Sequence, residues 1–139
     1  MFQDRDQMRM FYSQVLLKHD RRQPLEPMEQ MLLEVILLHP EYHEMLRDPE
    51  QAATREYAVA DGQTNPFLHM GMHIAIREQV SIDRPAGITP LYRRLVARLG
   101  ESEAEHRMMT CLGSMLWTAQ RENVPPDEQA YLACLHKLL

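Results

Sequence analysis

The chain has little of what a disulfide-stabilised or membrane-spanning protein needs. Only two of its 139 residues are cysteines, Cys111 and Cys134, which is too few for a disulfide framework or a closed thiolate zinc site. We therefore expect both thiols to be reduced and to pack as small hydrophobic groups. No apolar run approaches the roughly 18 residues of a membrane span. The N-terminal charges are not followed by an apolar segment, so we expect no signal peptide and a cytoplasmic location.

An excess of positive charge is also lacking. Lys and Arg number 15 against 20 Asp and Glu, which gives a net charge of −5 with His neutral. Phosphate binding needs a concentrated positive field, so we expect no nucleic-acid partner, and we expect no membrane partner either. Hydrophobic residues make up 45% and charged residues 25%, the balance of an ordinary globular domain. The length predicts a single helical domain over residues 1–139.

The pattern that is present is helical throughout. Apolar residues recur at i, i+3 and i+4, prolines stand at expected helix starts, and the alternation typical of strands is absent. We expect an all-α fold, a compact single-domain bundle of about six to seven short helices. The expected segments are residues 4–19, 27–38, 40–47, 49 to Asp61-Gly62, 66–82, Thr89-Pro90 to 99, 102–122 and Pro125-Pro126 onward.

Some positions carry more specific expectations. Ser102 and Glu105 have the spacing of a capping box, in which the acid serves the helix start. Gly71 and Gly113 lie inside expected helices, which suggests close approach of another helix or of a ligand. Helical spacing favours the core for Trp117 and for five methionines: Met28, Met31, Met72, Met108 and Met115.

The seven histidines are the most informative feature of the sequence. His69 and His73 are four residues apart, so both project from one helix face, on a stripe that continues through Ile76. His43, His69 and His106 each lie in the first turn of a separate expected helix. If these helix starts converge, His43, His69, His73 and His106 form a nitrogen-rich metal site. Additional ligands or orienting groups could come from His39, Glu41, Glu44 and Glu78. Such a set suits Zn, Fe, Ni or Cu better than Mg or Ca.

Two other interpretations remain open. Each histidine could instead be satisfied by a backbone carbonyl inside the core. In that case the chain would be a non-enzymatic helical interaction module, with a homodimer as one form. A metal-free acid–base pair of a histidine and a glutamate is the third interpretation. The sequence does not decide whether the protein is an enzyme, and it identifies no substrate and no catalytic residue.

Several segments resemble a known family. They are His39-Pro-Glu-Tyr-His43, Asn65-Pro-Phe-Leu-His69-Met-Gly-Met-His73-Ile-Ala-Ile-Arg-Glu78-Gln, Asp83-Arg-Pro and Glu105-His106-Arg-Met-Met. Together they are similar to a family of small proteobacterial proteins of unknown function, and the resemblance covers nearly the whole chain. It implies a helical bacterial cytoplasmic protein, and it implies no established activity, cofactor or catalytic residue.

Overall fold

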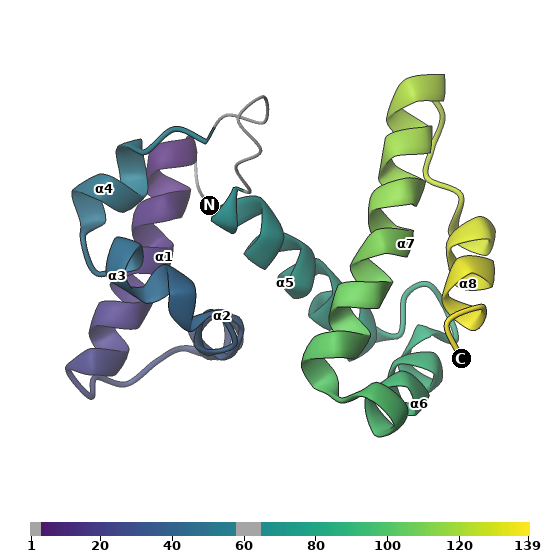
Figure 1. Cartoon of the computed structure of the whole chain (residues 1–139), viewed down its shortest axis with the longest axis horizontal. Helices are drawn as coiled ribbons and strands as arrows, with labels where there is room; N and C mark the ends of the chain where they lie inside the picture. The colour runs from purple at the N-terminus through teal and green to yellow at the C-terminus, as the bar shows by residue number, and fades with distance from the viewer. Residues whose placement is uncertain (1–3, 58–64) are drawn as a thin grey trace. The chain divides into compact units, whose positions relative to one another are not determined.

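The computed structural model describes residues 4–57 and 65–139, and all regular secondary structure in this part of the chain is helical (Figure 1). It contains eight α-helices, one short 3₁₀ helix and no strand, which confirms the all-α prediction. The helices are α1 (Arg5–Asp20), α2 (Pro27–Leu37), the 3₁₀ helix η1 (Pro40–Tyr42), α3 (His43–Leu46), α4 (Pro49–Thr54), α5 (Pro66–Ile82), α6 (Ile88–Leu99), α7 (Glu101–Glu122) and α8 (Glu128–His136).

Several helix starts follow from local sequence. The Asp4 carboxylate accepts a hydrogen bond from the backbone N–H of Gln7, which satisfies an otherwise unpaired donor of α1. Glu26 and Glu29 form a capping box at the start of α2. At α5, the Asn65 side chain accepts from the Phe67 N–H at 2.9 Å. The predicted bounds of this helix, residues 66–82, are confirmed at both ends.

Other predicted starts are wrong. Helix α6 begins at Ile88, before Thr89-Pro90, and Gly87 at its N-cap has a left-handed φ of 99°. Helix α7 begins at Glu101 after Gly100, so Ser102 and Glu105 do not form the predicted capping box. Helix α4 ends at Thr54. The end expected for it at Asp61-Gly62 lies outside the described residues.

The chain divides into two compact units, Met1–Gly71 and Met72–Leu139. That division does not test the prediction of one domain, which stays a prediction. In the first unit, α1 lies beside α2, α3 and α4 (Figure 1). The Ser13 hydroxyl in α1 donates a hydrogen bond to the Leu46 carbonyl in α3 at 2.5 Å. Fully buried side chains of this unit include Val15, Leu16, Val35, Ile36 and Leu46.

The second unit packs α6, α7, α8 and the C-terminal part of α5 around one apolar cluster. Its buried members include Ile76, Ile88, Leu95, Met108 and Leu135. The Tyr131 hydroxyl in α8 donates to the Gln79 side chain in α5 at 2.7 Å. This bond and the apolar cluster fix α8 against the rest of the unit.

Cys111 and Cys134 form a disulfide between α7 and α8, so the prediction of two reduced thiols is wrong. The two residues are 23 positions apart, and nothing in that spacing indicates contact. Because α7 packs beside α8, their Cα atoms come to 5.8 Å, well inside the range that a disulfide bridges.

Three expectations about packing are also wrong. Trp117 is 58% exposed, with the Arg121 guanidinium 4.3 Å from its ring centroid, and Met28 is 61% exposed. A Cβ added at Gly71 would meet no atom within 4 Å, and one at Gly113 would meet only the Met72 methyl group at 3.6 Å. Neither glycine therefore marks a close approach of helices. Met108, by contrast, is fully buried, as predicted.

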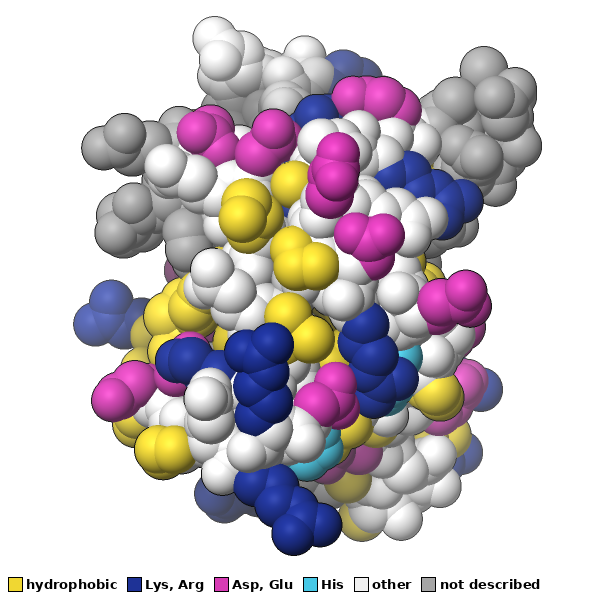
Figure 2. All heavy atoms as spheres, turned by 90° about the vertical axis from the view of Figure 1, so that its left-hand side faces the viewer, with side chains coloured by type: hydrophobic (Ala, Val, Ile, Leu, Met, Phe, Trp, Pro, Cys, Tyr) yellow, Lys and Arg dark blue, Asp and Glu magenta, His cyan; other side chains and the backbone are white. Residues whose placement is uncertain are grey.

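None of the described helices is apolar over a length that could cross a lipid bilayer. On the face shown in Figure 2, acidic and basic side chains alternate with apolar ones, and neither sign of charge forms a continuous field. The absence of a nucleic-acid partner stays a prediction.

Candidate metal centre

The first unit holds a pair of facing imidazoles, His39 and His69. His39 follows α2 and is buried, while His69 lies in the first turns of α5. The Nε2 atoms of the two rings are 3.0 Å apart, and the rings meet edge to face. Nδ1 of His39 lies 2.8 Å from the Val35 carbonyl oxygen. A carbonyl only accepts, so Nδ1 of His39 carries the hydrogen, and a neutral ring has its lone pair on Nε2.

The Tyr42 ring packs against this pair. It stacks on His39 with 5.2 Å between the ring centroids, and its centroid lies 6.4 Å from that of His69. Burial raises the pKa of the Tyr42 phenol, and the nearby Glu41 adds to the effect, so the hydroxyl stays protonated at neutral pH. Tyr42 therefore packs against the pair without adding a charge.

The second unit holds a similar pair, His73 from α5 and His106 from α7. Their Nε2 atoms are 3.2 Å apart, and the rings again meet edge to face. His73 is fully buried, and its Nδ1 lies 2.8 Å from Oε1 of Glu105, which is also fully buried. His73 thus has the same orientation as His39, with Nδ1 held by an acceptor and Nε2 facing a second imidazole.

Glu105 is the centre of a buried polar network. Nε of Arg77 donates to both carboxylate oxygens at 3.1 Å, and the Tyr92 hydroxyl donates to Oε2 at 2.5 Å. Arg77 also pairs with the exposed Glu101. The carboxylate thus receives hydrogen bonds from three side chains, which offset the cost of burying its charge.

The electrostatics of this network keep Glu105 ionised. Burial by itself raises the pKa of the carboxyl group, but the hydrogen bonds from His73, Tyr92 and Arg77 outweigh burial and bring the pKa below its usual value. Burial also raises the pKa of Tyr92, and the hydrogen bond to the carboxylate raises it further. Glu105 is therefore an anion at neutral pH, and Tyr92 is a neutral donor.

Both pairs have the arrangement that metal-binding histidines commonly show. In such sites Nδ1–H donates to a carbonyl or carboxylate, which fixes the tautomer and directs Nε2 toward the ion. Val35 supplies that acceptor for His39, and Glu105 supplies it for His73. The donor set consists of imidazole nitrogens, which suit Zn, Fe, Ni and Cu.

The other predicted site residues lie apart from the pairs or take different roles. Nε2 of His43 lies 2.8 Å from the Ile36 carbonyl, so this nitrogen is used by the backbone, and His39 takes the place expected for His43. The predicted acids Glu41, Glu44 and Glu78 are all exposed. The carboxylate that contacts a clustered imidazole belongs instead to Glu105, the residue expected to cap a helix.

Sequence reasoning also missed Arg77 and Tyr92 as members of the network. One signal for Arg77 was available, because it lies four residues after His73 on the same helix face. A similar signal existed for His39, which lies four residues after Val35 and seven after Leu32, both buried in α2. The buried face of α2 thus continues to His39.

None of the curated proteins and none of the solved structures that were compared matches this chain. One family model does match, over residues 4–137, which is nearly the full length. Its description assigns no activity. The chain belongs to the family described as "Domain of unknown function (DUF1841)".

Proposed function

We propose that the protein binds one transition-metal ion through His39, His69, His73 and His106. The observation that carries the proposal is the same in both pairs: Nε2 faces Nε2, and Nδ1 of one ring in each pair is held by an acceptor. A metal ion binds the lone pairs that these nitrogens direct toward each other.

The spacing within each pair supports this proposal. A tetrahedral zinc site with Zn–N bonds of about 2.0–2.1 Å places neighbouring ligand nitrogens about 3.3–3.4 Å apart. The Nε2–Nε2 distances of 3.0 Å and 3.2 Å are close to that value. Each pair is thus nearly preorganised as one edge of a coordination tetrahedron.

Helix α5 supports the use of both pairs in one site. His69 and His73 belong to different pairs but lie one turn apart on this helix. Residues four apart on a helix have Cβ atoms about 5–6 Å from each other, on the same face. The helix therefore presents one ligand from each pair in the same direction.

The ligand set favours a structural role over a catalytic one. Four protein ligands fill a tetrahedral site, whereas catalytic zinc sites keep a position for water or substrate. The metal would then stabilise the folded chain, because it binds the native ligand geometry and not the unfolded chain. We assign no reaction to the site.

Metal analysis of the full-length chain, purified without a histidine tag, tests the proposal. We expect close to one ion per chain by elemental analysis. After removal of metal with a chelator, adding back one equivalent of Zn²⁺, Ni²⁺, Cu²⁺ or Fe²⁺ should raise the melting temperature and saturate at a ratio of 1:1. Mg²⁺ and Ca²⁺ serve as controls and should have no such effect.

The competing explanation has a distinct outcome. A proton on Nε2 of His69 and of His106 could bridge each pair without a metal, as expected for histidines that are satisfied within the core. In that case the purified chain would hold no stoichiometric metal, and none of the transition-metal ions would change its melting temperature. That result would overturn the proposal.

A further inference from the structure

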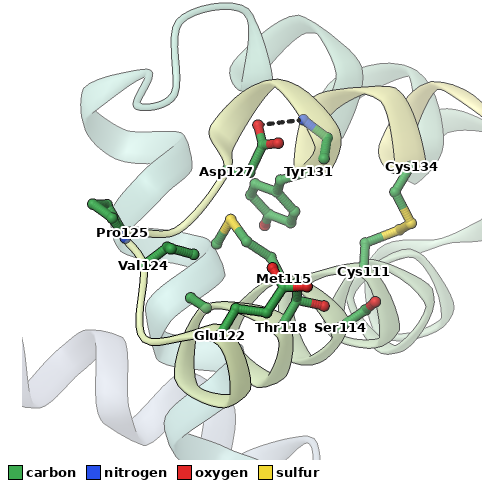
Figure 3. A pocket seen from close by; sticks show the side chains of 12 residues that line it. Cys111, Ser114, Met115, Thr118, Glu122, Val124, Pro125, Asp127, Tyr131 and Cys134 are labelled. Atoms are coloured by element: carbon green, nitrogen blue, oxygen red, sulfur yellow. Dashed lines mark hydrogen bonds between the residues drawn. A yellow bond between two sulfur atoms is a disulfide. The ribbon is translucent and has the colours of Figure 1, made fainter.

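A pocket of about 210 Å³ lies in the second unit between the C-terminal half of α7 and helix α8 (Figure 3). It uses none of the histidines or network residues described above. The Cys111–Cys134 disulfide lines one end, and Val124 and Pro125 line the other. The disulfide joins the two helices that form the walls, so it links them at that end of the pocket.

The charge of the pocket has one sign. Of its twelve lining residues, Glu122 and Asp127 are acidic, and none is Lys, Arg or His. Asp127 uses Oδ1 to accept the backbone N–H of Ala130 at 3.0 Å, which leaves Oδ2 for another donor. Glu122 pairs with Arg121 only at 3.4 Å, and both side chains are more than half exposed. Such surface pairs are weak, so Glu122 can exchange this partner.

The rest of the lining is largely apolar and aromatic. Tyr131 is buried, and its hydroxyl is engaged by Gln79, so the pocket receives the ring and not the hydroxyl group. Met115 places its thioether beside this ring in Figure 3. An aromatic face and a polarisable sulfur, with carboxylates close by, suit a positively charged group on an apolar body.

We propose that this pocket binds a small organic cation, a primary ammonium carried on a short apolar or aromatic body. The ammonium group would lie against the Glu122 and Asp127 carboxylates, and the body against Tyr131 and Met115. The cavity equals the liquid volume of about seven water molecules, at about 30 Å³ each, which limits the ligand to a small molecule. This inference does not depend on metal binding.

Calorimetric titration of the oxidised full-length chain with three matched probes tests the proposal. The probes are 2-phenylethylamine, neutral 2-phenylethanol and anionic phenylacetate, which share the aromatic body and differ in charge. We expect the amine to bind at least tenfold more tightly than either of the others. Equal affinity for all three probes, or no binding of the amine, would overturn the proposal.

Two charge-removing variants locate the binding. Asp127→Asn retains an N-cap residue for α8, because Asn caps helices as well as Asp does, and Glu122→Gln preserves the side-chain length. The double variant should lose most of the preference for the amine over the alcohol. Glu128→Gln makes the same change of charge at a residue outside the pocket and should retain the preference. If the double variant still binds the amine like the wild type, the assigned site is wrong.

Discussion

Nδ1 of His73 lies 2.8 Å from Oε1 of Glu105, and both side chains are completely buried. The carboxylate fixes the hydrogen of the imidazole on Nδ1 and therefore directs the Nε2 lone pair of His73 toward His106. Glu105 contacts the proposed ligand His73 but is not itself one of the four proposed ligands. Its proposed role is to position His73.

Glu105→Gln tests that role. The variant keeps the size of the side chain but removes the charge that orients His73. Loss of an orienting partner typically costs 10- to 100-fold in metal affinity, and we expect a decrease of about that size. Competition with a chromophoric chelator measures the affinity. Circular dichroism of the metal-free variant checks that it is folded.

Glu101→Gln is the matched control for this prediction. Glu101 also pairs with Arg77, but it is exposed and does not contact His73. Removing its charge should leave metal affinity within about twofold of the wild type. If both variants lose affinity equally, Glu105 acts through the general charge of the network and does not position His73.

Substitution of His39 and His43 separates the two candidates for the first-unit ligand. His39→Ala should abolish saturation at one ion per chain and the rise in melting temperature on adding metal. His43→Ala removes a bond to the Ile36 carbonyl, so it should lower stability with and without metal equally. Thermal unfolding of each variant, with and without one equivalent of Zn²⁺, measures both effects. The reverse pattern would restore His43 as the ligand.

Reduction of the Cys111–Cys134 disulfide should destabilise the chain. The crosslink spans 23 positions. Closing a loop of that length reduces the entropy of the unfolded chain and so raises its free energy by about 3 kcal/mol. We expect denaturant unfolding in a phosphine reductant, or of the double variant Cys111→Ala with Cys134→Ala, to show a loss of about this size. Two titratable thiols in the unreduced, denatured protein would show that the bond is absent.

Asp83 should contribute to the stability of the folded chain in a way that depends on pH. Its carboxylate accepts from the backbone N–H groups of Thr89 and Gly87, and these bonds hold its pKa below the usual range. A pKa that is lower in the folded state stabilises the protein above the unfolded pKa of about 3.9 and stops doing so as the pH falls through the folded pKa. The stabilisation from Asp83 is therefore fully present at pH 7.

Asp83→Asn should accordingly lower the melting temperature at pH 7, with a difference from wild type that shrinks as the pH falls below about 4. Asn suits the left-handed φ of 52° at this position, so the backbone itself should not be strained. Glu78→Gln, at an exposed position, controls for the change of net charge. A difference that is constant from pH 7 to pH 3 would contradict the assignment.

The sequence predicts a helix start well where the capping interactions lie within one turn of the helix. Asn65 followed by Pro66 predicts the start of α5, because an N-cap acceptor and a proline at the first position act within one turn. Ser102 and Glu105 carry an equally good local signal, and it fails. Gly100 ends one helix and precedes the next, and Glu105 is used by His73 from another helix.

Only the part of the candidate site that depends on local helix geometry could be predicted from the sequence. Helix periodicity predicts that His69 and His73 lie on one face of α5, but the imidazole that each of them contacts depends on tertiary packing. The sequence does not distinguish His39 from His43. Only the packing of α2 determines that Nε2 of His39 contacts His69 and that Nε2 of His43 contacts a carbonyl. The contact between Cys111 and Cys134 also depends on two helices packing side by side.

Helix α5 belongs to both compact units, since it runs from Pro66 to Ile82 and the division falls after Gly71. The amide groups just after that point donate to carbonyls of the preceding turn, so hydrogen bonds of the helix cross the division. Unwinding the helix at this point would break those bonds. We therefore expect slow amide hydrogen exchange at these positions, because the amides become exposed only when the helix opens there.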